Sequence, residues 1–154
     1  MGYVDRNLVP GEAVEYRASL HWIVFAAPLV AALAGVAAMI AGAAVGLGRS
    51  GIDLGVLALA IAAALALARW VVVHTSEFVV TNRRVLIKVG VFGRHSLELL
   101  LTKVEGIGVD QRLVGRLLGY GAIVVTGTGG TREAFERIAR PLRFRTEVQS
   151  RVPA

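Results

Sequence analysis

The chain has 154 residues, of which 55% are hydrophobic and 18% are charged, and its formal net charge is +6. A chain of this length has room for one modest domain. The absence of cysteine excludes disulfide bonds, thiolate catalysis and cysteine-ligated zinc or iron.

Residues 1–21 are expected to form a cytoplasmic N-terminal segment that contributes one strand. Pro10 and Gly11 predict a turn, since both residue types interrupt regular backbone structure. Over residues 14–18 apolar side chains alternate with Glu15 and Arg17, which is the two-residue period of a half-buried strand. A lone strand is not stable, so we predict that it pairs with a sheet formed later in the chain.

Residues 22–73 are predicted to form a transmembrane helical hairpin. No charged residue or histidine occurs from Trp22 to Gly48, a stretch longer than the about 20 residues needed to cross a hydrocarbon core. The second apolar run, residues 54–73, contains one charge, Arg69, which is near enough to its end to reach the headgroups. Because residues 49–53 are too few to hold a domain, the two helices must be antiparallel.

The distribution of charge predicts the orientation in the membrane. Residues 74–154 carry 13 Lys and Arg against 7 Asp and Glu, whereas the connection between the helices offers Arg49 alone. Cytoplasmic flanks gather Lys and Arg, so we predict a multi-pass protein of the inner (plasma) membrane with both termini cytoplasmic. A signal peptide is disfavoured because the first apolar run is long and begins about twenty residues into the chain. Nucleic-acid binding is disfavoured because aromatic residues on the basic part are few and scattered.

Small residues recur every four positions in both helices and predict a smooth face on each. Such faces allow close backbone approach, which would pack the hairpin or join neighbouring protomers. The alternative is that alanine and glycine are merely abundant here. The residues are Ala34, Ala38, Gly42 and Gly46 in the first helix and Ala58, Ala62 and Ala66 in the second.

Aromatic residues mark the predicted membrane interface. Trp22 and Trp70 fall near the cytoplasmic ends of the two helices, where amphipathic rings prefer to lie. His21 and His74 lie just outside them, at similar depth in an antiparallel hairpin. Two imidazoles at one level suggest a metal site with Glu77, but further ligands are missing, so we interpret both histidines as interfacial polar residues.

From Glu77 onward, short alternating segments and turns predict a small antiparallel sheet. Asn82 and Arg83 form the first predicted turn, and residues 90–93 form the second. The expected strands are residues 78–81, 85–89, 95–99, 104–109 and 121–126.

A short helix is predicted between residues 110 and 119. Asp110 is a favourable N-cap residue, and Gly119 is a favourable residue to end the helix. Four apolar residues share one helical face, so we expect the helix to lie on the sheet. They are Leu113, Val114, Leu117 and Leu118.

The end of the chain is predicted to add a strand and a closing helix. Residues 131–139 have helical propensity, but the Gly-Gly turn before them favours a returning strand, which is our prediction. Pro141 then opens a helix, because its missing N–H does no harm at the first position. The apolar stripe of this helix is Phe144, Val148 and Val152.

Three motifs make the chain resemble the membrane-anchored bacterial PH-domain family. They are Pro-Gly-Glu at residues 10–12, Thr-Asn-Arg-Arg-Val at 81–85 and Gly-Arg-Leu-Leu-Gly-Tyr-Gly at 115–121. The resemblance covers nearly the whole chain. It implies an α+β membrane protein in which a two-helix transmembrane hairpin is followed by a PH-like domain in residues 74–154, an antiparallel sheet plugged by the C-terminal helix. Because 81 residues are few for such a domain, we expect the strand at 14–18 to join it as the seventh.

PH-like folds are best known for phosphoinositide binding through basic residues on the first hairpin, which points here to Arg83, Arg84 and Lys88. The eight or so residues that lead from the membrane to this turn can span about 25 Å, so the turn is expected to face the cytosol. Arg83 and Arg84 are therefore predicted to bind a protein partner, or to pair within the domain with Glu98 or Glu105. Lipid contact is predicted instead at Trp22, Arg69, Trp70, Phe92 and Arg94.

These observations predict a non-catalytic, membrane-anchored PH-like adaptor or oligomeric assembly module of the bacterial cell envelope. The expected partners are the lipid bilayer and either a second copy of the chain or another membrane protein, without nucleic acid. The alternative is a module that recognises anionic lipid or senses membrane stress. No triad spacing, paired carboxylates or metal constellation stands out, so we expect no enzyme activity, no metal and no cofactor.

Overall fold

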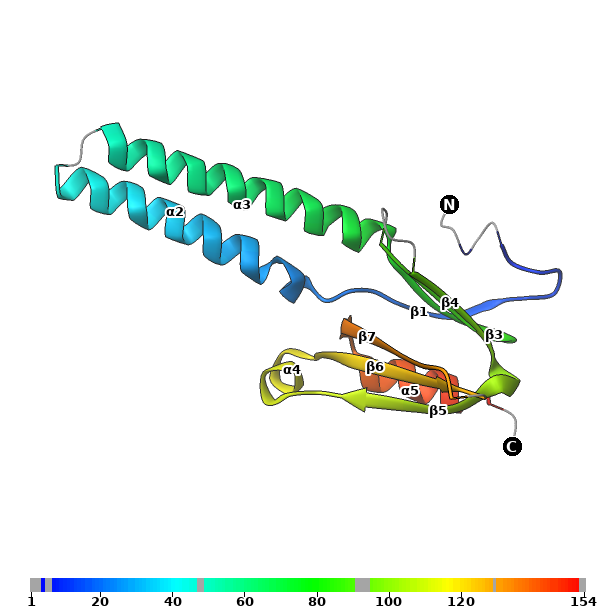
Figure 1. Ribbon diagram of the computed structural model, residues 1–154. Helices are drawn as coiled ribbons and strands as arrows, with labels where there is room; N and C mark the ends of the chain where they lie inside the picture. The colour runs from blue at the N-terminus through cyan, green and yellow to red at the C-terminus, as the bar shows by residue number, and fades with distance from the viewer. Residues whose placement is uncertain (1–3, 5–6, 47–48, 91–94, 129, 153–154) are drawn as a thin grey trace. The chain divides into compact units, whose positions relative to one another are not determined.

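The computed structural model describes residues 4, 7–46, 49–90, 95–128 and 130–152. The chain divides into two compact units, a helical unit of Trp22–His74 and a head unit of Met1–His21 together with Thr75–Ala154. The head unit is thus built from segments that precede and follow the helical unit in the sequence (Figure 1).

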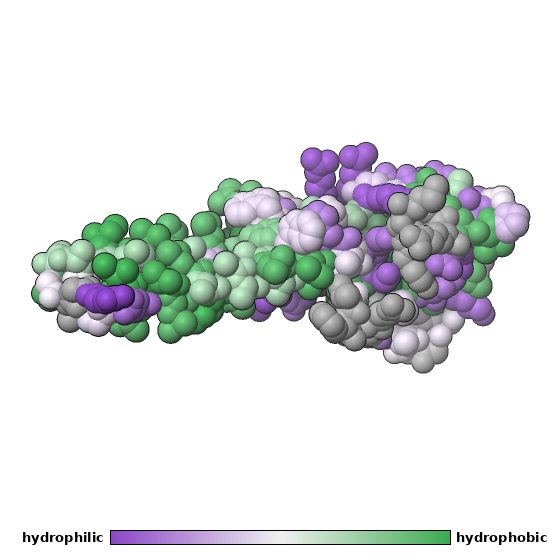
Figure 2. All heavy atoms as spheres, turned by 90° about the horizontal axis from the view of Figure 1, so that it is seen from above, coloured by the Kyte–Doolittle hydropathy of each residue, from purple (hydrophilic) through white to green (hydrophobic). Residues whose placement is uncertain are grey.

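Two long helices make up the helical unit. The 3₁₀ turn η1 (Trp22–Phe25) leads into α2 (Ala26–Ala44), and α3 (Arg49–Thr75) returns antiparallel to it (Figure 1). Both are long and apolar enough to cross a membrane, and only 17% and 6% of their most apolar stretches are buried. Figure 2 shows the apolar surface that this leaves along the helices. Residues 49–53, predicted to be a connection, belong to α3.

Glycines allow α2 and α3 to approach closely. Gly42 faces Gly51 at such short range that a β-carbon on Gly42 would lie 2.7 Å from the Cα atom of Gly51. A β-carbon on Gly35 would likewise lie 3.2 Å from the carbonyl oxygen of Gly55. Larger side chains at these positions would push the helices apart, so backbone contact packs the hairpin.

The predicted small-residue faces are only partly right. The buried residues of α2 are Pro28, Gly35 and Gly42, a seven-residue spacing that keeps one seam toward a partner helix. Ala62 of α3 is buried, as predicted. The predicted members that are exposed instead are Ala34, Ala38 and Gly46.

The head unit contains two antiparallel sheets. The first has the order β1-β2-β3-β4, with β1 (Val14–Ala18), β2 (Glu77–Thr81), β3 (Arg84–Val89) and β4 (His95–Leu100). A 3₁₀ turn, η2 (Leu101–Lys103), leads to the second sheet, β5-β6-β7, with β5 (Val104–Asp110), β6 (Tyr120–Gly127) and β7 (Arg132–Ala139). The pairing of Ala18 with Phe78 confirms that the N-terminal strand joins the later sheet. The strand predicted over residues 131–139 is confirmed as β7.

Strands of both sheets and the last helix share one core. Alternate residues of β6 are buried, as expected for a strand with one face toward the core. The helix α5 (Pro141–Gln149) inserts Phe144 and Val148, both fully buried as predicted. Val152, the third residue of the predicted stripe, lies beyond the end of the helix and is partly buried against the core. Tyr16 of β1 meets the Phe144 ring edge-on, with centroids 6.2 Å apart. The segment before the helical unit is therefore fastened to the helix that closes the domain.

The short helix α4 (Leu113–Leu118) departs from the prediction. Asp110 ends β5 instead of capping the helix, because the residue that precedes the helix is Arg112. Gly119 ends it as predicted, in the left-handed conformation with φ of 79°. The buried residue of α4 is Gly115, whereas the four apolar residues expected to face the sheet are exposed: Leu113, Val114, Leu117 and Leu118.

Candidate functional site

Two sequence motifs that lie far apart in the chain meet at the turn between β2 and β3. Glu12 accepts a hydrogen bond from the hydroxyl of Thr81 at 2.8 Å and two from Arg84, through Nε and Nη2, each at 2.8 Å. Arg84 also forms an ion pair with Glu98 and donates to the carbonyl oxygen of Asn7 at 2.8 Å. The two motifs therefore form one polar junction between the N-terminal segment and the first sheet.

This environment changes the acidity of Glu12. The hydrogen bonds from Arg84 lower the pKa of its carboxyl group from 4.5 to about 2, against the opposing effect of burial. The backbone N–H of Val9, which donates at 2.9 Å, and the hydroxyl of Thr81 act in the same direction as Arg84. The side chain of Glu12 is fully buried and that of Arg84 is 13% exposed. The pair is therefore ionised throughout the physiological pH range.

The two arginines that were predicted to bind a partner differ in their accessibility at this turn. Asn82 fastens the turn to the N-terminal segment, because its amide accepts from the N–H of Ala13 at 3.1 Å and donates to the carbonyl oxygen of Gly11 at 3.2 Å. Arg84 is held by carboxylates of the head unit, whereas Arg83 is exposed. Partner binding by this pair stays a prediction, with Arg83 as the accessible member.

The residues predicted to contact lipid are accessible where the structure describes them. Trp22 and Trp70 are 58% and 51% exposed, and Arg69 is exposed beside Trp70 on α3. Phe92 and Arg94 lie outside the described residues. Lipid contact at these five positions stays a prediction.

The two histidines next to the tryptophans have aromatic neighbours. His74 packs against Trp70 within the helical unit, with centroids 4.2 Å apart. His21 stacks on Tyr120 within the head unit, with centroids 5.2 Å apart. In the described part of the chain, no three residues of the types His, Cys, Asp and Glu gather as metal ligands would.

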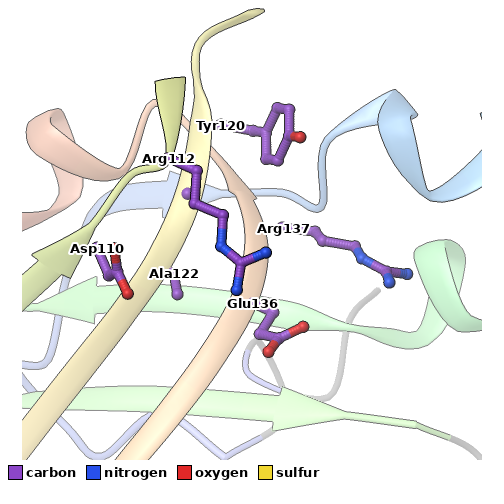
Figure 3. Close-up of a pocket in the computed structure, with 7 residues that line it drawn as sticks. Asp110, Arg112, Tyr120, Ala122, Glu136 and Arg137 are labelled. Carbon is purple, nitrogen blue, oxygen red and sulfur yellow. The ribbon is translucent and has the colours of Figure 1, made fainter. Parts of the chain in front are cut away.

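A pocket of about 280 Å³ opens beside Tyr120 at one end of the second sheet. Its walls come from the end of β5, the residue before α4 and the paired strands β6 and β7. Figure 3 shows the Arg112 side chain extending toward Glu136, whereas the Arg137 side chain points away from both residues. Asp110 adds a second acid to the lining. Because the pocket combines two acids with Arg112, it favours no ligand of either charge, and we assign it none.

Comparison with known proteins identifies the family. The family described as "Bacterial PH domain" matches residues 23–152, which include both long helices and every strand except β1. The chain belongs to the bacterial PH domain family. Among curated proteins no match is found. A solved structure that is similar to this bacterial PH domain is that of a DUF1696-family protein with a pleckstrin-homology domain from Shewanella loihica PV-4. The identity is 15% over 53% of this chain and 74% of that chain, with a TM-score of 0.42.

Sequence reasoning missed two features of this bacterial PH domain. Glu12 was not predicted as the partner of Arg84, although the Pro-Gly-Glu motif that contains it was noticed. The outward face of α4 was also missed. Two signals were available in the sequence. Gly115 stands in the middle of the helix, and Arg112 before the helix and Arg116 within it are basic.

Proposed function

We propose that this bacterial PH domain is a non-catalytic adaptor or assembly module held in the cell membrane by the α2–α3 hairpin. The observation that carries the proposal is the single family match over residues 23–152, which takes in both apolar helices and most of the PH-like domain. The head unit offers an exposed cationic turn at Arg83 and exposed apolar side chains on α4, which suit binding.

The dimensions of the helical unit support a membrane anchor. At 1.5 Å per residue, the 27 residues of α3 reach about 40 Å, which exceeds a hydrocarbon core of about 30 Å. The strand before the hairpin, β1, pairs with β2, which follows the hairpin. A hairpin that spans the membrane would therefore keep both termini on one side, and the excess of Lys and Arg supports the cytoplasm as that side.

The working surface that we assign to the adaptor is the β2–β3 turn. Arg84 and Asn82 are engaged in fixing this turn to the N-terminal segment, so they position Arg83 without being free themselves. The partner is a second copy of this chain or another membrane protein that presents acidic groups to Arg83.

The mass of the full-length protein in detergent tests the assembly role. We expect light scattering to give several times the chain mass of 16.3 kDa, and Arg83→Glu to lower that mass without changing the unfolding temperature. Arg132→Glu, which changes an exposed arginine of β7, is the matched control and should leave the mass unchanged. A monomer at every protein concentration, or an oligomer whose mass is unchanged by Arg83→Glu, would contradict the assignment.

A second candidate function is recognition of anionic lipid or sensing of membrane stress. Two observations favour it. Arg69 is exposed among the apolar residues of α3, and the ring of the adjacent Trp70 is exposed as well. The full chain is required for its test, because a fragment of residues 74–154 lacks β1. Native mass spectrometry should show phosphatidylglycerol retained in preference to phosphatidylcholine, and Arg69→Gln should remove the preference. Equal retention of the two lipids by the unmodified protein would count against it.

A further inference from the structure

Helix α4 presents apolar side chains to the outside of the head unit. Leu113 and Leu117 are 85% and 87% exposed, more than any other large apolar residue in the described part of the chain. Val114 and Leu118 are exposed beside them. A cluster of this kind on a folded domain marks a contact surface, because leaving it in water costs free energy and favours aggregation.

The backbone fixes α4 in this orientation. Gly115 faces the head unit so closely that a β-carbon on it would lie 2.6 Å from the carbonyl oxygen of Tyr120. The side-chain amide of Gln111 donates to the same oxygen at 2.9 Å. Residues two positions away lie about 200° around a helix, so Leu113 and Leu117 must point outward. The exposure is therefore built into the fold.

Cationic side chains accompany the apolar cluster. Arg112 precedes the helix and Arg116 lies within it, and both are exposed. Apolar side chains with basic flanks are typical of segments that lie in the headgroup region of a bilayer, where the apolar groups leave water and the cations meet lipid phosphates.

The helix lies at the end of the head unit from which the chain leaves for the helical unit. The N–H of His21 donates to the carbonyl oxygen of Arg137 at 2.7 Å, and the ring of His21 stacks on Tyr120, which follows α4 after one glycine. The next residue after His21 is Trp22, which begins the first candidate span. Because the end of β1 pairs with the start of β2, the returning chain enters the head unit at the same end.

We propose that α4 inserts its apolar side chains into the headgroup region of the bilayer that α2 and α3 span. The inference rests on the proposed membrane anchor. A second copy of the chain is a poorer occupant, because four side chains on a six-residue helix offer less than the about 800 Å² per partner of a stable interface. The proposed anchor, in contrast, begins at Trp22, the residue that directly follows this end of the head unit in the sequence. The contact turns one end of the head unit to the lipid and leaves Arg83, at the far end of β2, away from it.

Single labelled cysteines test the inference in the full-length protein, which has no cysteine of its own. Leu117→Cys reports on α4, and Leu57→Cys reports on the exposed apolar surface of α3. Thr102→Cys is the matched control, because Thr102 is exposed and follows Leu101, whose N–H donates to the carbonyl oxygen of Arg83 at the opposite end of the head unit. Each variant carries an NBD fluorophore in vesicles of phosphatidylcholine and phosphatidylglycerol. The vesicles are prepared without quencher, with lipids that bear a nitroxide near the headgroup, or with lipids that bear it along the acyl chain.

We expect the nitroxide lipids to quench the label at position 117 at least twofold more than the label at position 102. Quenching at position 57 but not at 117 would overturn the inference about α4 and leave the anchor intact. No quenching at position 57 by nitroxides placed at any depth would overturn the anchor itself. A label at 117 that emits as in apolar surroundings but escapes lipid quenching would reveal a protein partner and would also overturn the inference.

A second substitution separates insertion from mere proximity to the membrane. Adding Leu113→Asp to the chain labelled at position 117 should halve the quenching, because the substitution removes an apolar side chain from the inserting face and the anionic lipids repel the new carboxylate. Adding Leu142→Asp, on the exposed face of α5, should leave the quenching unchanged. Equal quenching in both double variants would contradict insertion through α4.

Discussion

Glu12 and Arg84 are 72 residues apart in the sequence, and their side chains form an ion pair at the turn between the two central strands of the first sheet. Both hydrogen bonds from Arg84 reach the carboxylate at 2.8 Å, and the hydroxyl of Thr81 adds a third. Removing one member of a buried pair costs about 3–5 kcal/mol, because the remaining charge loses its compensation. This junction is therefore where single substitutions should affect the head unit most sharply.

Replacing Glu12 with Gln is expected to lower the free energy of unfolding by about 2–3 kcal/mol, somewhat less than the full cost because Glu98 still pairs with Arg84. Thermal unfolding followed by circular dichroism in detergent measures the loss. Glu15→Gln is the control, since Glu15 pairs with Arg151 near the surface at 3.2 Å and such pairs contribute less than about 1 kcal/mol. Equal losses in the two variants would contradict the role assigned to Glu12.

The lowered pKa of Glu12 predicts that the folded head unit loses stability in acid. Between pH 4.5, the ordinary pKa, and about 2, the pKa in the folded chain, the unfolded state binds a proton that the folded state does not. The contribution of Glu12 is therefore complete above pH 4.5 and is lost as the pH falls toward 2. The unfolding temperature should fall more steeply over this range for the unmodified protein than for Glu12→Gln, and parallel curves would count against the pair.

The sequence predicted this junction in part. Pairing of Arg84 with Glu98 was one of the alternatives, and the structure contains it. Glu12 could not be found in the same way, because alternation and turn signals report on neighbours along the chain. Its contact forms when the segment before β1 folds against a turn that the chain reaches only after the helical hairpin.

Among the elements, α4 shows what a helical period leaves undecided. The spacing of its apolar residues defines a face, but the same face suits a protein core or a lipid surface. Gly115 decides the orientation here, because only a residue without a β-carbon fits against the carbonyl of Tyr120. The strand β7 was predicted correctly against its helical propensity from the glycines that precede it in the sequence. Of these, Gly130 has a φ of 81°, a turn conformation that glycine adopts most readily.

The close contact between α2 and α3 predicts that a larger side chain between the two helices destabilises the hairpin. Gly42→Leu should lower the free energy of unfolding by about 1–3 kcal/mol, since the added side chain meets the backbone of Gly51. Ala38→Leu introduces the same side chain on the exposed face of the same helix and should have little effect. Loss of helical circular dichroism on heating in detergent compares the two. A greater loss for Ala38→Leu would mean that the helices pack through the other face.

On the scale of the whole molecule, the head unit is closed by segments from both sides of the hairpin. β1 pairs with β2, and Arg151, just beyond α5, reaches back to Glu15 of β1 at 3.2 Å. Composition and period predicted the two long helices, the strands and the closing helix. They did not predict that the strands divide into two sheets, because that division depends on contacts between residues distant in the sequence.

The central claim is that the α2–α3 hairpin spans the membrane and holds a PH-like head on its cytoplasmic side. Because the chain has no native cysteine, a membrane-impermeant maleimide tests it directly on spheroplasts that contain Ser50→Cys or Thr102→Cys protein. Both residues are exposed, Ser50 at the start of α3 and Thr102 in the head unit. We predict that the cysteine at position 50 reacts in intact spheroplasts and the one at position 102 only after the membrane is opened. Equal labelling of both positions in intact spheroplasts would contradict the account.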